Sequence, residues 1–208
     1  MKRASQRIND SFDASDREDI YRFLDWVRSA ISERSQQLRR TVTIAILLIA
    51  VFEVVIQSPR TEVALGSFRL YRGSFVLQFV PVLIAYLYYQ LVIDSCHLNE
   101  MQDISAAAFS KWSSKGYENG LHPLIQSPMP SYWNITGAQP DLTLSKIETT
   151  AEYIFVILIL LGVPAFEAQA YYALYDSSTV HVLWIASVIV STIFCVMAIW
   201  HFIVYNMN

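Results

Sequence analysis

Charged residues are scarce in this sequence. They make up 16% of the 208 residues, and 54% are hydrophobic, whereas soluble domains carry about 25% charged residues. The net charge of −3 at pH 7 gives no basis for direct binding of nucleic acid. The apolar residues gather in long blocks, and this distribution predicts membrane spans rather than a large soluble core.

Motifs for catalysis and for cofactor binding are also missing. The four histidines are scattered and match no metalloprotease spacing, and the chain has neither a glycine-rich phosphate loop nor a nucleophile elbow. The two cysteines, Cys96 and Cys195, are not spaced as metal ligands. The first forty residues contain no apolar signal segment. The sequence therefore predicts a protein that is not an enzyme and that carries no cofactor.

Four apolar segments predict an all-α integral membrane protein built from two transmembrane hairpins. Pro81 is expected to kink the second span, and Gly162 and Pro164 weaken the third. Cytoplasmic segments 1–40 and 94–148 flank the first hairpin, at 41–93, and the second hairpin occupies 149–208. The four spans are expected at 41–57, 75–93, 150–174 and 180–204.

The distribution of Lys and Arg predicts the orientation. Nine of the fifteen lie before residue 41 and three lie in segment 94–148, against three in segment 58–74 and none in the turn at 176–179. Cytoplasmic loops carry the excess of basic residues, so both termini are expected in the cytoplasm. The expected location is the bacterial inner membrane.

An amphipathic helix is predicted before the first span. Ser15 and Glu18 have the spacing of a capping box. No Gly or Pro separates this helix from the first span, so it either continues into the membrane or bends to lie on the membrane surface. Alternating apolar residues around Gly66 and Ser67 predict a small β-hairpin in the connector. The apolar stripe of the helix comprises Ile20, Phe23, Leu24, Val27 and Ile31.

Two carboxylates lie well inside the apolar segments, Glu53 in the first span and Glu167 in the third. A charged carboxylate costs about 2.5–3.5 kcal/mol in the middle of a span, so each should face protein or water. One interpretation is a proton or cation site, or a ring of carboxylates in an oligomeric pore. The other is a structural ion pair with the arginines of the outer connector, namely Arg60, Arg69 and Arg72.

A weaker metal hypothesis comes from Asp94 and His97, whose spacing puts a carboxylate and an imidazole on one helix face. Glu148 and Glu152 share a face at a comparable level and would have to complete the site. Polar residues are common at a membrane boundary in any case, and no metal is therefore expected.

Four aromatic residues of the cytoplasmic segment form a separate group. They either pack on the apolar stripe of the N-terminal helix, which is the favoured interpretation, or form a docking surface for a protein partner. They are Trp112, Tyr117, Tyr132 and Trp133.

The leading functional hypothesis is a homo-oligomeric, non-enzymatic membrane subunit that acts as a pore or membrane sensor and is coupled to a cytoplasmic protein partner. Its expected contacts are membrane lipids, further copies of itself and that partner. In size and topology the chain is similar to small multispan accessory proteins of bacterial anti-phage modules, a likeness of type only. The alternative is an accessory structural subunit of a larger respiratory or photosynthetic membrane complex. A metal-dependent membrane enzyme ranks last.

Overall fold

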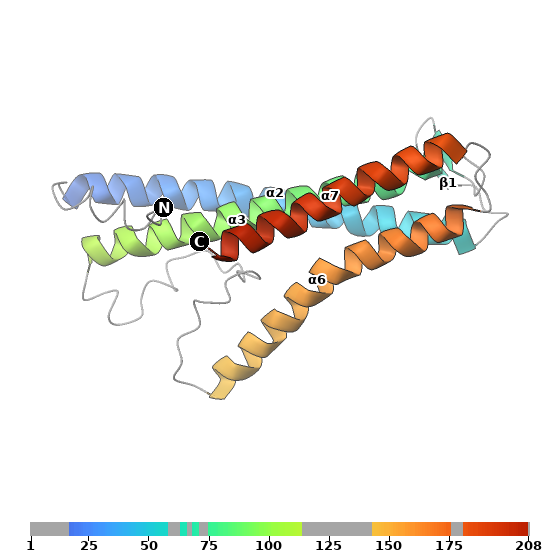
Figure 1. Cartoon of the computed structure of the whole chain (residues 1–208). Coiled ribbons are helices and arrows are strands. Elements are labelled where there is room, and N and C mark those ends of the chain that lie inside the picture. Colours follow the sequence, from blue (N-terminus) through green and yellow to red (C-terminus); the bar gives the residue numbers. More distant parts are fainter. Residues whose placement is uncertain are drawn as a thin grey trace.

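The computed structural model describes residues 17–57, 63–65, 68–70, 75–113, 143–175 and 181–207. Four long helices dominate this part of the chain, as Figure 1 shows, and the predicted all-α class is confirmed apart from one short strand pair. The elements in chain order are α2 (Arg17–Gln57), β1 (Val63–Leu65), β2 (Phe68–Leu70), η1 (Phe75–Gln78), α3 (Phe79–Trp112), α6 (Thr143–Tyr175) and α7 (His181–Met207).

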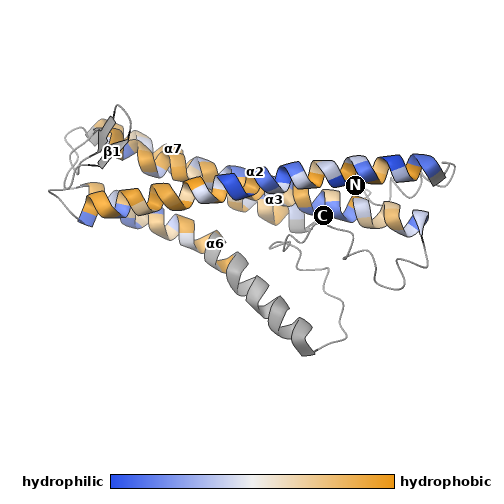
Figure 2. Ribbon diagram, turned by 180° about the vertical axis from the view of Figure 1, so that it is seen from behind, coloured by the Kyte–Doolittle hydropathy of each residue, from blue (hydrophilic) through white to orange (hydrophobic). Residues whose placement is uncertain are grey.

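Three of the helices, α2, α3 and α7, are long and apolar enough to cross a membrane, so the prediction of a membrane protein is supported. The remaining predicted span, 150–174, falls within α6, where many side chains lie outside the described residues. Figure 2 shows that the hydrophobic residues concentrate in the half of the molecule near β1, which we call the membrane half. Much of α2 in the other half of the molecule is hydrophilic.

Helix α2 is continuous over 41 residues and therefore about 60 Å long, twice the thickness of the hydrocarbon layer. The predicted amphipathic helix continues directly into the first span instead of turning to lie on the surface. Its sequence contains no Gly or Pro that would break it. Where the apolar part begins, the hydroxyls of Thr41 and Thr43 donate to carbonyls one turn earlier, at 3.2 and 2.9 Å.

Helices α2 and α3 extend together beyond the end of α7, at the left of Figure 1. We call this extension the two-helix arm and define it as residues 17–40 of α2 and 94–112 of α3. The predicted apolar stripe of α2 faces α3, and Val27 and Ile31 are buried against Leu98. The amphipathic pattern of α2 is therefore explained by a partner helix within the same chain. Partly buried side chains around this contact are Phe23, Met101 and Ile104.

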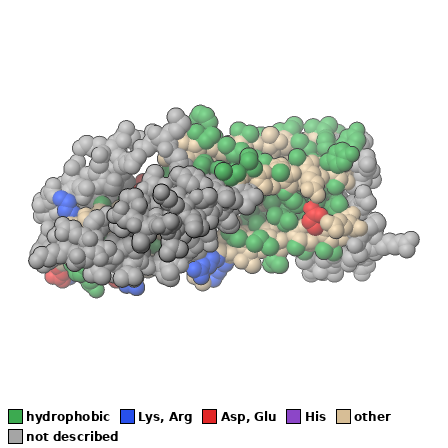
Figure 3. Space-filling view, turned by 90° about the horizontal axis from the view of Figure 1, so that it is seen from below, with side chains coloured by type: hydrophobic (Ala, Val, Ile, Leu, Met, Phe, Trp, Pro, Cys, Tyr) green, Lys and Arg blue, Asp and Glu red, His purple; other side chains and the backbone are tan. Residues whose placement is uncertain are grey.

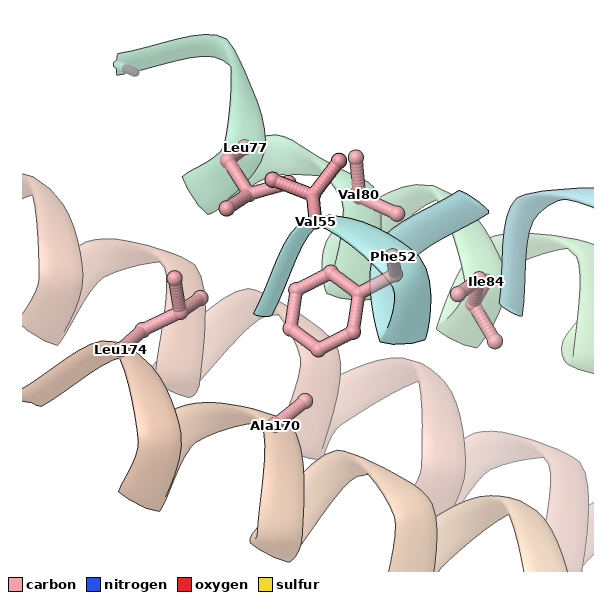
Figure 4. Packing of buried hydrophobic residues seen from close by; sticks show 7 residues of the cluster. All are labelled: Phe52, Val55, Leu77, Val80, Ile84, Ala170 and Leu174. Atoms are coloured by element: carbon pink, nitrogen blue, oxygen red, sulfur yellow. The ribbon is translucent and has the colours of Figure 1, made fainter. Parts of the chain in front are cut away.

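The core of the membrane bundle lies near the other end, where α2, α3 and α6 meet. Figure 4 shows the Phe52 ring of α2 directed toward Ala170 of α6. Phe52 also packs edge-on against Phe166, with ring centroids 5.6 Å apart. Close van der Waals packing of this kind holds helices together in lipid. The buried cluster comprises Phe52, Val55, Leu77, Val80, Ile84, Ala170 and Leu174.

The contact between α3 and α7 is made by small and aromatic residues. Ala85 and Ala198 are completely buried there, and small residues let two helix backbones approach closely. Pro81, at which a kink was predicted, is the third residue of α3. Backbone N–H groups in a first helical turn have no partner within the helix, so this proline removes no hydrogen bond.

Helix α6 contains Pro164 in its interior. Figure 1 shows that α6 bends along its length and that its N-terminal half points away from the other helices. A proline at this position deprives the carbonyl four residues earlier, that of Leu160, of its helical donor. The hydroxyl of Tyr88 on α3 donates to this carbonyl at 3.3 Å. A residue of another helix thus satisfies the group that the proline frees.

The predicted hairpin in the connector is confirmed by β1 and β2, which pair antiparallel with Val63 opposite Leu70 and Leu65 opposite Phe68. Residues 66 and 67 lie outside the described part.

Large apolar side chains also cover the outside of the membrane half. Figure 3 shows hydrophobic side chains gathered over one end of the molecule, interrupted by an acidic patch, whereas Lys and Arg lie toward the other end. On α7 this surface includes Val182, Val196 and Trp200, which are 76%, 58% and 67% exposed. Such a surface suits contact with lipid tails or with another membrane helix.

Candidate functional site

Two groups of buried polar residues stand out in the apolar helices. The first, which we call the boundary site, joins α2 to α3 where the two-helix arm meets the membrane half, and it centres on Arg34 and Asp94. The second, which we call the Glu167 site, lies between α6 and α7 inside the membrane half. Both include buried oxygen atoms that have no hydrogen-bonding partner.

At the boundary site, Nη1 of Arg34 lies 3.0 Å from Oδ1 of Asp94 and donates a hydrogen bond to it. The side chain of Asp94 is only 5% exposed, whereas that of Arg34 is 41% exposed. The guanidinium therefore reaches the surface while it neutralises a carboxylate enclosed between the helices. The two residues are 60 positions apart in the sequence, so the pair fixes the register between α2 and α3.

The same level of the helix pair contains other buried polar groups. Ser35 and Ser95, each next to a member of the ion pair, are 5% and 1% exposed. Their hydroxyl oxygens and Oδ2 of Asp94 have no hydrogen-bonding partner among the described residues. A buried polar group left in this state costs about 1–3 kcal/mol. The boundary site is thus a polar layer between the apolar contacts of the arm and those of the bundle.

The two described residues of the metal hypothesis, Asp94 and His97, face different neighbours. Asp94 faces Arg34, whereas His97 has a half-exposed side chain whose Nδ1 lies 3.8 Å from Oε2 of Glu100. The side chains of Glu148 and Glu152 lie outside the described residues. Within the described part of the chain, no three His, Cys, Asp or Glu residues are grouped so that they would hold a metal ion.

Glu53 lies on the surface side of α2 in the membrane half. It is partly exposed, and its Oε2 accepts a hydrogen bond of 2.9 Å from Nε2 of Gln57, one turn further along the helix. Of the arginines predicted to pair with the intramembrane acids, Arg60 and Arg72 lie outside the described residues. Arg69 belongs to β2, but its side chain is not described.

Glu167 has a different environment. It is 5% exposed, and neither carboxyl oxygen has a hydrogen-bonding partner among the described residues. Tyr171, one turn later on α6, and Cys195 on α7 are close enough to interact with it electrostatically. Ser191 of α7 is its neighbouring hydroxyl. The two acids therefore occupy different surroundings, one at the bundle surface and one within it.

A hydrogen-bond network that the sequence did not reveal holds α6 to α7 beside Glu167. The Tyr171 hydroxyl donates to the carbonyl of Ser187 at 2.9 Å and lies 2.6 Å from the hydroxyl of Ser191. Nε1 of Trp184 donates to the carbonyl of Tyr171 at 3.1 Å. The only sequence signal is spacing, because Ser187 and Ser191 share one face of α7, as Glu167 and Tyr171 share one face of α6.

Of the four aromatic residues proposed for docking, the structure describes Trp112. Its ring centroid lies 6.1 Å from that of Tyr21 on α2 and 5.7 Å from that of Phe109. Trp112 therefore contacts the N-terminal helix, at Tyr21, which is not a member of the predicted apolar stripe. The other three, Tyr117, Tyr132 and Trp133, lie outside the described residues.

Comparisons with protein-family models, with curated proteins and with solved structures gave no match.

Proposed function

We propose that this chain is a non-enzymatic membrane subunit that acts as a homo-oligomeric sensor and couples its membrane bundle to a protein partner in the cytoplasm. The observation that carries the proposal is the continuity of α2 and α3 from the membrane half into the two-helix arm, with Arg34 and Asp94 joining them at the boundary.

The proposed topology has four spans, with α6 as the third and the two-helix arm in the cytoplasm of a bacterial cell. The support is the excess of Lys and Arg in and before the arm, nine of fifteen in the first 40 residues, because cytoplasmic segments carry this excess. Helix α2 begins and α7 ends toward the same side of the molecule in Figure 1, as an even number of spans requires.

The coupling follows from the stiffness of the helices. A tilt or shift of α2 against α3 in the membrane half must move the arm, because neither helix is broken between the two. The boundary ion pair resists sliding of one helix past the other, whereas the unpartnered hydroxyls beside it gain from a rearrangement that gives them partners. The membrane and the arm are therefore mechanically connected.

Self-association is supported by the outer surface of the bundle. Glu53 and Gln57 form a polar pair on the exposed side of α2, among apolar neighbours such as Val54, which is 49% exposed. A carboxylate facing lipid is unfavourable, and a second copy packed on this face would shield it.

The first test is the mass of the full-length protein in nanodiscs, purified through a tag on the C-terminus, with all co-purifying proteins identified. A particle whose mass is a whole multiple of the chain is expected. A monomer, or a protein recovered only with several different membrane subunits, would refute the oligomeric sensor and favour an accessory subunit.

Coupling is tested by hydrogen exchange of the arm in nanodiscs whose lipids differ in chain length. Exchange in residues 17–40 is expected to change with bilayer thickness in the wild type. A variant with two glycines inserted after Arg40 should lose this response, whereas the same two residues added after Asn208 should have no effect. An unchanged response in the first insertion variant would contradict the proposed coupling.

A further inference from the structure

Glu167 is the enclosed carboxyl group of the membrane half. It lies eight residues before the end of α6, about 12 Å along the helix axis, and 95% of its surface is covered, since it is 5% exposed. Among the described residues, both carboxyl oxygens lack a hydrogen-bonding partner. A carboxyl group buried to this degree loses most of its hydration, which disfavours the ionised form.

The hydrogen atoms of the adjoining network determine what Glu167 can bind. The Tyr171 hydroxyl has one hydrogen and gives it to the carbonyl of Ser187. The contact of 2.6 Å between Tyr171 and Ser191 allows either hydroxyl to be the donor. In the arrangement that also satisfies the Ser187 carbonyl, Ser191 donates to Tyr171, and its oxygen can accept from its neighbour Glu167. A protonated Glu167 can donate to that oxygen, but a carboxylate, which only accepts, cannot use it.

Among the described residues, the titratable groups that interact with Glu167 supply no positive charge. They are Tyr171 on α6 and Cys195 on α7, and Cys195 in turn interacts with Tyr88 on α3. Among the described residues no Lys, Arg or His forms an ion pair with Glu167. Asp94 at the boundary site has Arg34, and Glu167 has no such partner.

A metal cation suits this place less well than a proton. Hard cations take about six oxygen ligands, and the groups beside the Glu167 carboxyl are one hydroxyl, one phenol and one thiol. The Ser187 carbonyl is already an acceptor for Tyr171. A proton needs a single acceptor, which Ser191 provides.

We propose that Glu167 is a proton-binding site of the membrane bundle, which carries its proton at neutral pH and donates it in a hydrogen bond to Ser191. The site lies three residues after Pro164, at the bend of α6, and one turn from the Tyr171 network that joins α6 to α7. Loss of the proton places an uncompensated charge in that contact. The inference rests on these contacts and does not depend on the proposed function.

The test is infrared spectroscopy of the full-length protein in nanodiscs of phosphatidylcholine and phosphatidylglycerol, in which a protonated carboxyl absorbs apart from a carboxylate. At pH 7 the wild type should show a protonated-carboxyl band that Glu167→Gln lacks. Glu53→Gln, the matched control at the other intramembrane acid, should retain the band. Glutamine has the shape of the neutral acid, so the substitution should leave the bundle folded.

A second variant, Ser191→Ala, tests the hydrogen bond. It also assigns the band to Glu167 if Glu167→Gln fails to fold. Ser191→Ala removes the acceptor, so the band should move to higher frequency, as expected for a carboxyl whose O–H is free. A wild type without the band at pH 7, or a band that Glu167→Gln leaves in place, would overturn the proton site. A band that Ser191→Ala does not shift would overturn the proposed proton acceptor.

Discussion

Removing either partner of the boundary ion pair should lower the free energy of unfolding, and the loss should differ between the two partners. Arg34→Met removes the charge and keeps much of the apolar stem, leaving the Asp94 carboxylate enclosed without compensation. Asp94→Leu leaves an arginine whose side chain is 41% exposed and can turn to water. We therefore expect the arginine variant to be the more damaging one.

The magnitudes follow from burial. Removing one partner of a buried ion pair costs about 3–5 kcal/mol. Asp94 is buried but Arg34 is not fully so, and we expect about 3 kcal/mol for Arg34→Met. Asp94→Leu should cost about 1–2 kcal/mol, close to the loss of a hydrogen bond between charged groups. The double variant replaces the pair by apolar residues and should be near neutral, so the coupling energy should be about 4–5 kcal/mol in magnitude.

The assay is reversible unfolding of the purified protein in mixed micelles with increasing mole fraction of dodecyl sulfate. Arg28→Met is the matched control, since Arg28 is exposed on the same helix, and it should stay within about 0.5 kcal/mol of the wild type. If the two single variants add within about 0.5 kcal/mol, or if Asp94→Leu costs as much as Arg34→Met, the reasoning is refuted.

Three further outcomes are expected from the same protein. Tyr88→Phe should lower the unfolding free energy by about 1 kcal/mol, because the carbonyl freed by the proline of α6 loses its donor; an unchanged value would show that the contact contributes nothing. Phe52→Ala should cost about 3 kcal/mol by leaving a cavity, whereas Leu47→Ala, at a side chain 59% exposed, should cost far less, and equal losses would contradict the assigned core. Cys96 and Cys195 are 2% and 8% exposed, so maleimide should label neither until the protein unfolds, and rapid labelling of the native state would show that the helices are not packed as described.

Much of the fold was predictable because the hydrophobic pattern depends on local sequence. The period of the stripe on residues 20–31 indicated a helix with one buried face, and the structure places α3 on that face. The lack of Gly and Pro between residues 17 and 57 allowed a continuous helix. Sequence alone left the alternative of a surface helix open, because an apolar stripe packs equally well on lipid or on another helix.

The boundary site was not predictable in the same way. Arg34 and Asp94 are each common residues at a membrane boundary, and they lie 60 positions apart in the sequence. Their contact therefore depends on how α2 and α3 are aligned. Asp94 and His97 were grouped from their spacing, but the rotation of α3 turns the first toward α2 and leaves the second half exposed. Helix rotation is fixed by packing against neighbours, which no single-helix pattern specifies.

The same reasoning separates the two intramembrane acids. Both were expected well inside the apolar segments, and that position follows from counting residues along a span. Enclosure depends on which side of each helix meets the bundle. Glu53 is partly exposed and pairs with Gln57 on the outer side of α2, whereas Glu167 is three residues from the buried Ala170 and shares its side of α6. The two acids are therefore distinguished by the burial of the residues three or four positions away on the same helix, and not by their distance from the end of the span.

The two enclosed carboxyl groups differ in how their charge is balanced, and this difference assigns them different roles. Asp94 has a guanidinium 3.0 Å away, so its charge is compensated within the contact that it makes between α2 and α3. Glu167 forms no ion pair with a described residue, and at the proposed proton site it donates to Ser191, so the contact between α6 and α7 depends on whether a proton is present. In the proposed sensor, the contact that changes with protonation therefore lies inside the membrane half beside the bend of α6. The ion pair between α2 and α3 lies where these helices leave the membrane. Transmission toward the arm requires this arrangement, because a change in the bundle moves the arm only if α2 and α3 stay attached to each other at the boundary site.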